Sequence, residues 1–265
     1  CDYRGVRVAY APPPSAGVLL CELMNILERF PMAEYGQNSV QGLHVTAEAM
    51  KLVFADRSRF MGGYPQYAPP EKGLTSKAYA AERARLIDPA RAMSSEAMPG
   101  DPLLFESRDT THFAVADAEG NVVTNTFTLG SSYGAHVMAP ATGFFLNDAM
   151  ANFNWSNDEP ANRPEPGKRV VTTITPVIAF KDGKPWLAAG SPGGTRIISS
   201  MAQLLVNVID HRLNIAEATE RPRIFQAASN TPVEFEPDFP PDVLRLMEAR
   251  GHKTRMSLTM GDRKS

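Results

Sequence analysis

The spacing of apolar side chains predicts mostly helices in the first third of the chain. Residues 3–10 alternate loosely and predict one strand. Between Ser15 and Pro31, apolar residues recur every three or four positions, which predicts a helix that Ser15 caps and Pro31 ends. Residues 38–57 carry an apolar stripe with charged residues largely on the opposite face, and residues 75–87 predict a shorter helix.

Beyond Asp109 the period of the pattern becomes two, as in a β-strand. Apolar residues alternate on both sides of a turn at 117–121, which predicts a hairpin, and residues 170–180 and 185–189 predict another. Helical spacing returns in two later segments, residues 197–209 and 242–250. Helices, then hairpins, then helices around one core predict an α+β fold rather than alternating βαβ units.

Composition narrows the possible functions. The chain has 265 residues, of which 43% are hydrophobic and 21% charged, and this is enough to build a sizeable core. A net charge of -2, without a dense Lys/Arg run, predicts no nucleic-acid partner. No apolar run reaches the roughly 20 residues of a membrane helix, so no membrane partner is predicted. Cys21 lies in a helical apolar pattern, where a small buried side chain is expected.

Candidate chemistry is sparse when each motif is taken alone. The histidines form no HExxH motif and no cluster of metal-ligand spacing, so neither a metal nor another cofactor is expected. Ser191 lacks the spacing of a nucleophile elbow, and no Walker lysine follows Gly193 and Gly194. The Gly-Gly turn could aim backbone N–H groups at an anion, but for this motif alone a tight turn without a ligand is the more common explanation. Thr110 and Thr111 are ordinary residues at the head of a strand.

Taken together, the motifs are more specific. In their order along the chain they resemble the gamma-glutamyltranspeptidase family. The matching segments are Pro12-Pro13-Pro14-Ser15-Ala16-Gly17, Ala55-Asp56-Arg57, Thr110-Thr111-His112-Phe113, Asn125-Thr126-Phe127-Thr128-Leu129, Gly190-Ser191-Pro192-Gly193-Gly194-Thr195-Arg196-Ile197 and Asn207-Val208-Ile209-Asp210. The resemblance implies a four-layer αββα N-terminal nucleophile hydrolase, made as one precursor and cleaved between Asp109 and Thr110. Residues 1–109 would then end the large subunit and residues 110–265 would form most of the small one, in one shared structural domain.

The resemblance also implies roles for individual residues. Thr110 would be the nucleophile, and its freed α-amine, with a pKa of about 7.7 to 8 in model peptides, would be the base. Thr128 would orient Thr110, and the backbone N–H groups of Gly193 and Gly194 would form the oxyanion hole. The segment before the cut, residues 93–108, has little periodicity and is expected to be an exposed, deformable connection.

The substrate pocket matches the family only in part. Thr172 and Thr173 occupy the positions of a serine pair that holds the α-carboxylate of the substrate, so the hydroxyls are kept. Gly130, Ala149 and Asn152 occupy the positions that hold the α-amino group, and all three differ from the family pattern. Hydrogen bonds with a charged group contribute about 1.5 to 3 kcal/mol, so weaker selection of an amino group is expected, as in glutaryl or cephalosporin acylases.

Several alternatives stay open at this point. The substrate is a γ-glutamyl compound or another small acyl amide, and the reaction is either hydrolysis or transfer to an amine. Both ends look truncated against the family, so the rest of the large subunit is an expected partner, and a non-catalytic homologue or fragment is a second hypothesis. Cys1 as an N-terminal nucleophile is a weaker one. A periplasmic or secreted location is suggested by the resemblance alone.

Overall fold

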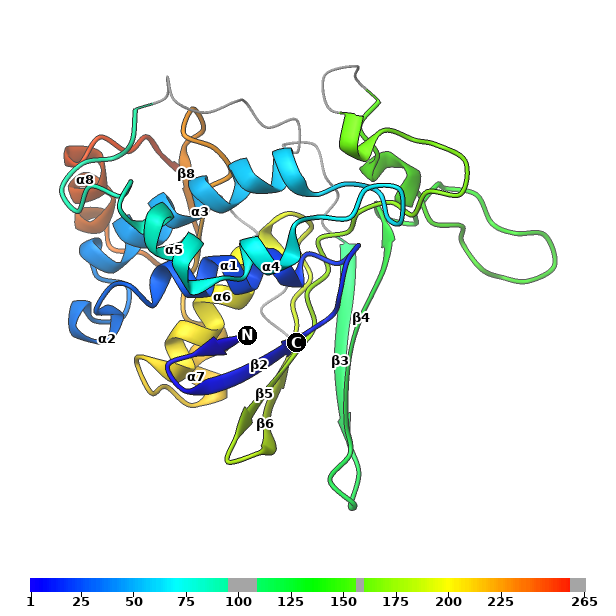
Figure 1. The fold of residues 1–265 in the computed structure, drawn as a ribbon, viewed down its shortest axis with the longest axis horizontal. Helices are drawn as coiled ribbons and strands as arrows, with labels where there is room; N and C mark the ends of the chain where they lie inside the picture. Colours follow the sequence, from blue (N-terminus) through cyan, green and yellow to red (C-terminus); the bar gives the residue numbers. More distant parts are fainter. Residues whose placement is uncertain (95–108, 156–159, 258–265) are drawn as a thin grey trace.

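The computed structural model describes residues 1–94, 109–155 and 160–257. Helices gather on one side of a central sheet, and a long hairpin lies on the other side (Figure 1). The sheet has the order β1-β2-β5-β6, and every neighbouring pair is antiparallel. Its strands are β1 (Asp2–Tyr3), β2 (Val6–Tyr10), β5 (Val177–Lys181) and β6 (Lys184–Ala189). The fold thus mixes helix and sheet, as the apolar spacing predicts.

The prediction of a single strand over residues 3–10 is wrong. The chain reverses between β1 and β2 at Arg4 and Gly5, which have φ angles of 52° and 78°. Two consecutive positive φ angles are typical of a tight hairpin turn whose twist matches the strands. Strand β2 then pairs with β5, with Val8 opposite Ala179, and so joins the first residues of the chain to its second half.

Helix α1 (Gly17–Leu27) is buried along its whole length. The predicted cap is wrong, because Ala16 occupies the N-cap position and makes no side-chain capping bond. The Ser15 hydroxyl instead donates to the Ile174 carbonyl at 2.6 Å, across the fold. Cys21 is buried in this helix, as expected.

Helix α3 (Val40–Phe60) begins at Ser39, whose side chain accepts a hydrogen bond from the Gly42 N–H. Its charged face is buried as well as its apolar stripe. Glu48 pairs with Lys51 at 2.6 Å, and Asp56 pairs with Arg83 at 3.1 Å. The helix is therefore enclosed on both faces, and its buried charges are paired within the helix or with the distant Arg83.

The other α-helices lie on the helical side of the sheet, whereas the 3-10 helices lie near the end of the hairpin, where η3 contacts strand β4 (Val122–Gly130) (Figure 1). Ser76 caps α5 by accepting from the Tyr79 N–H, at the predicted start, and Gly251 follows α8 with a φ angle of 94°. These helices are α2 (Met32–Tyr35), α4 (Glu71–Leu74), α5 (Lys77–Ala84), α6 (Arg196–Ile209), α7 (Ile215–Glu220) and α8 (Pro241–Ala249), with the 3-10 helices η3 (Ala149–Asn152) and η4 (Pro160–Asn162).

A small sheet near the C-terminal end packs against α3. It consists of β7 (Ile224–Phe225), β8 (Val233–Phe235) and β9 (Thr254–Met256), with β8 and β9 parallel. His252, just before β9, is buried against α3, where its Nε2 lies 2.7 Å from His44 Nδ1. Burial, with the nearby Lys51, His44 and Arg250, lowers the pKa of His252 to about 3. The imidazole is therefore neutral at physiological pH.

None of the helices that the structure describes is long and apolar enough to cross a membrane. The connection predicted over residues 93–108 lies, from residue 95 onward, outside the described residues.

Candidate active site

The predicted nucleophile lies on a two-stranded hairpin whose faces differ in chemistry. Strand β3 (Asp109–Ala116) pairs antiparallel with β4 (Val122–Gly130), and Thr110 lies opposite Thr128. Because side chains alternate across a strand, Thr110 and His112 share one face with Thr128 and Thr126. The opposite face carries exposed apolar side chains, namely Phe113, Val115, Val123 and Phe127.

Thr110 and Thr128 contact each other directly. The Thr110 hydroxyl donates to Thr128 Oγ1 at 3.2 Å, and the Gly130 N–H donates to the same oxygen at 3.0 Å. The ladder register shifts between Asp109 and Thr110, so the strand is irregular at the predicted cleavage bond. Bulges of this kind are frequent next to active sites, because they redirect one side chain.

His112 connects this face of the hairpin to the glycine-rich loop. Its Nδ1 lies 3.0 Å from Thr126 Oγ1, and burial lowers its pKa, so that the ring is neutral at pH 7. A Cβ added to Gly190 would lie 2.2 Å from His112 Nδ1, so the ring packs directly on this glycine. The Thr124 hydroxyl also reaches the Ala189 carbonyl, at 3.3 Å. The face that bears Thr110 is therefore packed against the start of the loop.

The loop ends in the two glycines of the predicted oxyanion hole. Gly193 and Gly194 have φ angles of 130° and 57°, a region that favours glycine. Their carbonyls accept hydrogen bonds from Arg196 and Ile197, at the start of α6. Within the described part of the chain, neither glycine N–H donates to another group. Two unengaged donors at a helix N-terminus are suited to a developing negative charge.

Gly130 has a neighbour that the sequence pattern does not reveal. A Cβ on Gly130 would lie 1.7 Å from Asp148 Oδ1, so this carboxylate fills the space beside the glycine. Asp148 is half-buried and accepts hydrogen bonds from the Ser131 N–H, at 2.9 Å, and from the Ser131 hydroxyl. A carboxylate thus lies next to the residue whose N–H contacts Thr128.

The other predicted pocket residues lie in the 3-10 helix that follows Asp148 or in the segment that this helix contacts. Ala149 begins η3 directly after Asp148, and Asn152 ends that helix. The Asn152 side-chain amide donates to the Val171 carbonyl at 3.4 Å, next to Thr172 and Thr173. Thr172 is half-buried, while Thr173 is almost fully buried. The structure therefore links the predicted pocket residues, in a chain of contacts, to the hairpin that carries Thr110.

The sequence predicts no site role for His112 or Asp148. His112 is part of the Thr110–Phe113 motif, and its position two residues after Thr110 puts both side chains on one face of a strand. Asp148 has no local signal, because its approach to Gly130 depends on the path of the chain between them. A hydroxyl, two free N–H donors and a carboxylate are the kinds of group that binding a polar carbonyl compound and attacking its carbonyl carbon require.

Known proteins resemble the chain along its whole length. The family model of gamma-glutamyltranspeptidase matches residues 1–264. The glutathione hydrolase proenzyme of Escherichia coli (strain K12) is 41% identical over 275 residues, covering 100% of this chain and 47% of that protein. The acylase ACY 1 proenzyme of Pseudomonas sp. (strain SE83) is 41% identical over 254 residues, covering 95% of this chain and 44% of that protein.

Solved structures that superpose on the chain are also acylases and gamma-glutamyltranspeptidases. The cephalosporin acylase of Bacillus halodurans superposes with a TM-score of 0.86 at 31% identity, over 98% of this chain and 47% of that one. A mutant of the Helicobacter pylori gamma-glutamyltranspeptidase gives a TM-score of 0.55 at 35% identity, over 57% of this chain and 87% of that one. The chain spans about half the length of the curated relatives it matches. It belongs to the gamma-glutamyltranspeptidase family.

Proposed function

We propose that the chain is the catalytic part of an amidase or acyltransferase that moves a γ-glutamyl or related acyl group from an amide to water or an amine. The observation that carries this proposal is the contact between Thr110 Oγ1 and Thr128 Oγ1, 3.2 Å apart, on the hairpin face packed against the glycine-rich loop. The family supports the general kind of reaction, since the relatives are glutathione hydrolases and acylases.

In the proposed reaction, the Thr110 hydroxyl attacks the carbonyl carbon of the amide. The free α-amine of Thr110 accepts the hydroxyl proton, and the N–H groups of Gly193 and Gly194 stabilise the oxyanion that forms. The amine returns the proton to the leaving nitrogen as the C–N bond breaks, which leaves an ester on Thr110. Water or an acceptor amine then opens the ester by the same path in reverse.

The α-amine exists only after the Asp109–Thr110 bond is cut, so the proposal includes self-cleavage. The Thr110 hydroxyl would attack the Asp109 carbonyl, the C–N bond would break as the Thr110 nitrogen takes up a proton, and water would hydrolyse the resulting ester. The register shift between Asp109 and Thr110 supports this site, because the ladder is already irregular at that bond.

The hydroxyls of Thr172 and Thr173 are proposed to hold a carboxylate of the acyl group. Two features of the site decide whether it would also recognise an α-amino group on the substrate, and they favour different substrates. Substitutions at Gly130, Ala149 and Asn152 remove its expected partners, and this favours a second candidate, a glutaryl-type acylase. The Asp148 carboxylate, in the space beside Gly130, supports recognition of an ammonium group instead. We place γ-glutamyl donors first because a carboxylate there gives such a donor a charged partner.

The exposed apolar face of the hairpin bears on the proposed domain organisation. Phe113 and Val115 on β3, with Val123 and Phe127 on β4, are all at least half exposed. A strand face of this kind normally packs on another layer. We propose that the sheet and hairpin are the two β layers of a four-layer αββα hydrolase, with residues 1–109 and 110–265 as segments of the two subunits. Another part of a longer protein would cover this face.

Mass spectrometry and activity measurements on the full-length protein test the proposal. We expect two polypeptides, one of which begins at Thr110, and hydrolysis of γ-glutamyl-p-nitroanilide or glutaryl-p-nitroanilide. The Thr110→Ala variant should stay uncut and inactive. Thr111→Ala is the matched control, because Thr111 is the neighbouring threonine on the opposite, exposed face, and this variant should be cut and active.

Each outcome distinguishes between the hypotheses. A folded wild-type protein that stays uncut and hydrolyses neither anilide would identify a non-catalytic homologue. Preference for the γ-glutamyl anilide supports the first candidate, and preference for the glutaryl anilide supports the second. If Thr110→Ala keeps its activity and iodoacetamide abolishes it, Cys1 would be the nucleophile instead.

A further inference from the structure

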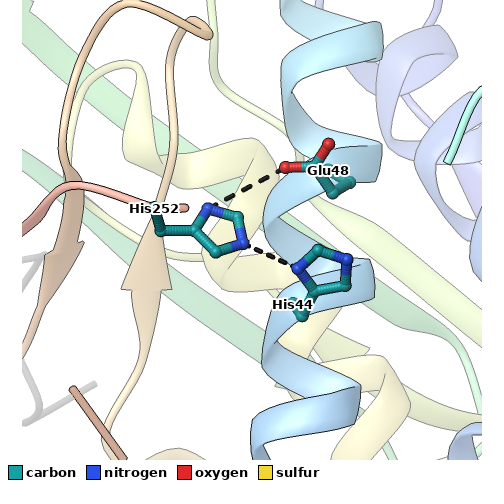
Figure 2. A group of neighbouring side chains, drawn as sticks. All are labelled: His44, Glu48 and His252. Atoms are coloured by element: carbon teal, nitrogen blue, oxygen red, sulfur yellow. Dashed lines mark hydrogen bonds and ion pairs between the residues drawn. The ribbon is translucent and has the colours of Figure 1, made fainter. Parts of the chain in front are cut away.

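A second cluster of chemically active side chains lies on α3, in a part of the fold that the proposed reaction does not use. His44 and Glu48 are one turn apart on this helix, and His252 lies between them, from the segment that follows α8 (Figure 2). All three residues are buried. Their potential ligand atoms lie within 4.8 Å of one another. The linear spacing of the histidines gave no sign of this, since His252 is far from the other two in the sequence.

The hydrogen bonds of the cluster fix where the imidazole protons lie. His44 Nε2 lies 2.8 Å from the Asp88 carbonyl, which can only accept, so this nitrogen carries the proton. His44 Nδ1 is then an acceptor, and His252 Nε2, 2.7 Å away, must donate to it. In a neutral ring, His252 Nδ1 is therefore left with a lone pair.

That lone pair faces another acceptor. His252 Nδ1 lies 3.8 Å from Glu48 Oε1, and it has no hydrogen-bond partner among the described residues. Glu48 Oε1 already accepts from Lys51, but His252 Nδ1 has no such group. Buried polar atoms are normally satisfied, so this nitrogen calls for a cation or a proton donor beside it. The dashed lines in Figure 2 mark both contacts of the His252 ring.

There is space for such a group. Lys51 and His252 line a cavity of about 320 Å³, together with Gln226 and Ser229. Gln226 Oε1 and Ser229 Oγ also lack hydrogen-bond partners in the described part of the chain. The cavity borders the cluster at Lys51 and His252, and it is large enough for water ligands of a cation bound there.

We propose that His252 Nδ1 and the Glu48 carboxylate bind a divalent transition-metal ion of the Zn²⁺ or Co²⁺ class, with His44 as the residue that orients His252. In this arrangement every hydrogen bond already present is kept on the two histidines. His44 accepts a hydrogen bond from His252 Nε2 and so holds that imidazole in the tautomer needed for binding. Water in the cavity completes the coordination. Imidazole nitrogen with carboxylate oxygen favours this class over Mg²⁺ or Ca²⁺, which prefer oxygen ligands alone.

The geometry is close to what such an ion requires. Zinc binds histidine nitrogen and carboxylate oxygen at about 2.0–2.2 Å, so two ligands of a tetrahedral ion lie about 3.4 Å apart. The observed separation of 3.8 Å between His252 Nδ1 and Glu48 Oε1 requires the two atoms to approach by about 0.4 Å.

Lys51 is the competitor for the site. Its ammonium lies 2.6 Å from Glu48 Oε1, while Glu48 Oε2 accepts from the Met93 N–H at 2.8 Å. An ion bound at Oε1 must displace the ammonium, which can move into the cavity that Lys51 lines. Removal of this positive charge should therefore strengthen metal binding, which a purely structural ion pair would not do.

The proposal is tested on the full-length protein, with any histidine tag removed, by titration with zinc chloride and cobalt(II) chloride. We expect one zinc ion per chain to remain after gel filtration, a visible absorption band with cobalt, and a rise in Tm on addition of zinc. His252→Asn should abolish these signals. His44→Asn should weaken zinc binding by roughly 10- to 100-fold, as is typical when a second-shell partner is lost. Lys51→Met should bind zinc more tightly than the wild type.

The control is His136→Asn. His136 is exposed, lies outside the cluster and has a φ angle of 56°, a conformation that asparagine tolerates. This variant should bind zinc as the wild type does. Absence of stoichiometric zinc from both the wild type and Lys51→Met would overturn the proposal, whether or not the histidine variants fold. Zinc binding that His252→Asn leaves unchanged would overturn it too, because the ion would then lie elsewhere.

Discussion

Replacement of Thr128 by valine removes the hydroxyl that contacts the proposed nucleophile and keeps the shape of the side chain. Two donors lose their acceptor in this variant. One is the Thr110 hydroxyl, 3.2 Å from Thr128 Oγ1, and the other is the Gly130 N–H, 3.0 Å from the same atom. These two losses should appear in different measurements.

The Thr110 contact acts on the rate, because it fixes the rotamer from which the hydroxyl attacks. A neutral hydrogen bond contributes about 0.5–1.5 kcal/mol, which corresponds to a roughly 2- to 13-fold loss in kcat/KM. The Gly130 N–H is left without this acceptor both in the free enzyme and during reaction, so its loss lowers the stability of the fold. An unsatisfied donor lowers the free energy of unfolding by about 1–3 kcal/mol, and partial exposure of Gly130 favours the lower end.

The assay compares Thr128→Val and Thr128→Ser with the wild type, using cleaved full-length enzyme and an acyl anilide substrate. Serine keeps the hydroxyl, so Thr128→Ser should retain most of the rate and stability. Urea unfolding measures the second effect separately. The reasoning fails if Thr128→Val reacts at the wild-type rate, or if the serine variant loses as much activity as the valine variant.

Three further changes have expected outcomes. Gly190→Ala should displace the His112 ring, because the new Cβ would lie 2.2 Å from His112 Nδ1. The variant should have a lower kcat/KM, and its free energy of unfolding should fall by about 1–3 kcal/mol. Gly73→Ala is the control, because nothing lies within 4 Å of the new Cβ, and it should change neither quantity. Asp148→Asn should raise KM roughly 10- to 150-fold for a γ-glutamyl anilide, with little change for a glutaryl anilide; equal effects on both would contradict ammonium recognition. Burial, with the nearby Asp56 carboxylate, raises the pKa of Glu22 in the folded protein well above its usual range. Above about pH 4.3 the Glu22 carboxyl therefore ionises in the unfolded chain but not yet in the folded one, so the wild type should lose stability as pH rises. Glu22→Gln should remove this slope in urea unfolding between pH 4 and pH 8, and an unchanged slope would contradict the assignment.

The hairpin that carries Thr110 could be predicted because its signal is local. Alternation over residues 109–130 specifies both strands and the turn between them, and the pairing of Thr110 with Thr128 follows from that register. The start of α5 at the Ser76 cap and the extent of α6 were predictable for the same reason, since capping and apolar spacing act within a few residues, whereas α5 ends three residues before the predicted Ile87. Contacts with distant segments did not alter the pairing of the hairpin or the position of these helices.

Other predictions failed where a local pattern met a distant partner. Ser15 has the side chain of a helix cap, but the Ile174 carbonyl is within its reach and the hydroxyl bonds there instead. Residues 3–10 alternate as one strand, yet Arg4 and Gly5 adopt positive φ angles and fold the segment into two. In both cases the tertiary structure stabilises an alternative that the local sequence also permits.

The buried charges of α3 show most clearly what a single sequence conceals. A polar residue opposite an apolar stripe is expected to face water, and Glu48 fits that expectation until His252 is brought beside it. A charge stays buried only if partners compensate it. Lys51 on the same helix compensates Glu48, whereas Arg83, which compensates Asp56, comes from a segment that no spacing rule connects to the helix. Asp148 reaches Gly130 in the same way. Local periodicity therefore predicts the strands of the hairpin, whereas the ligands of a pocket or an ion depend on how distant segments meet.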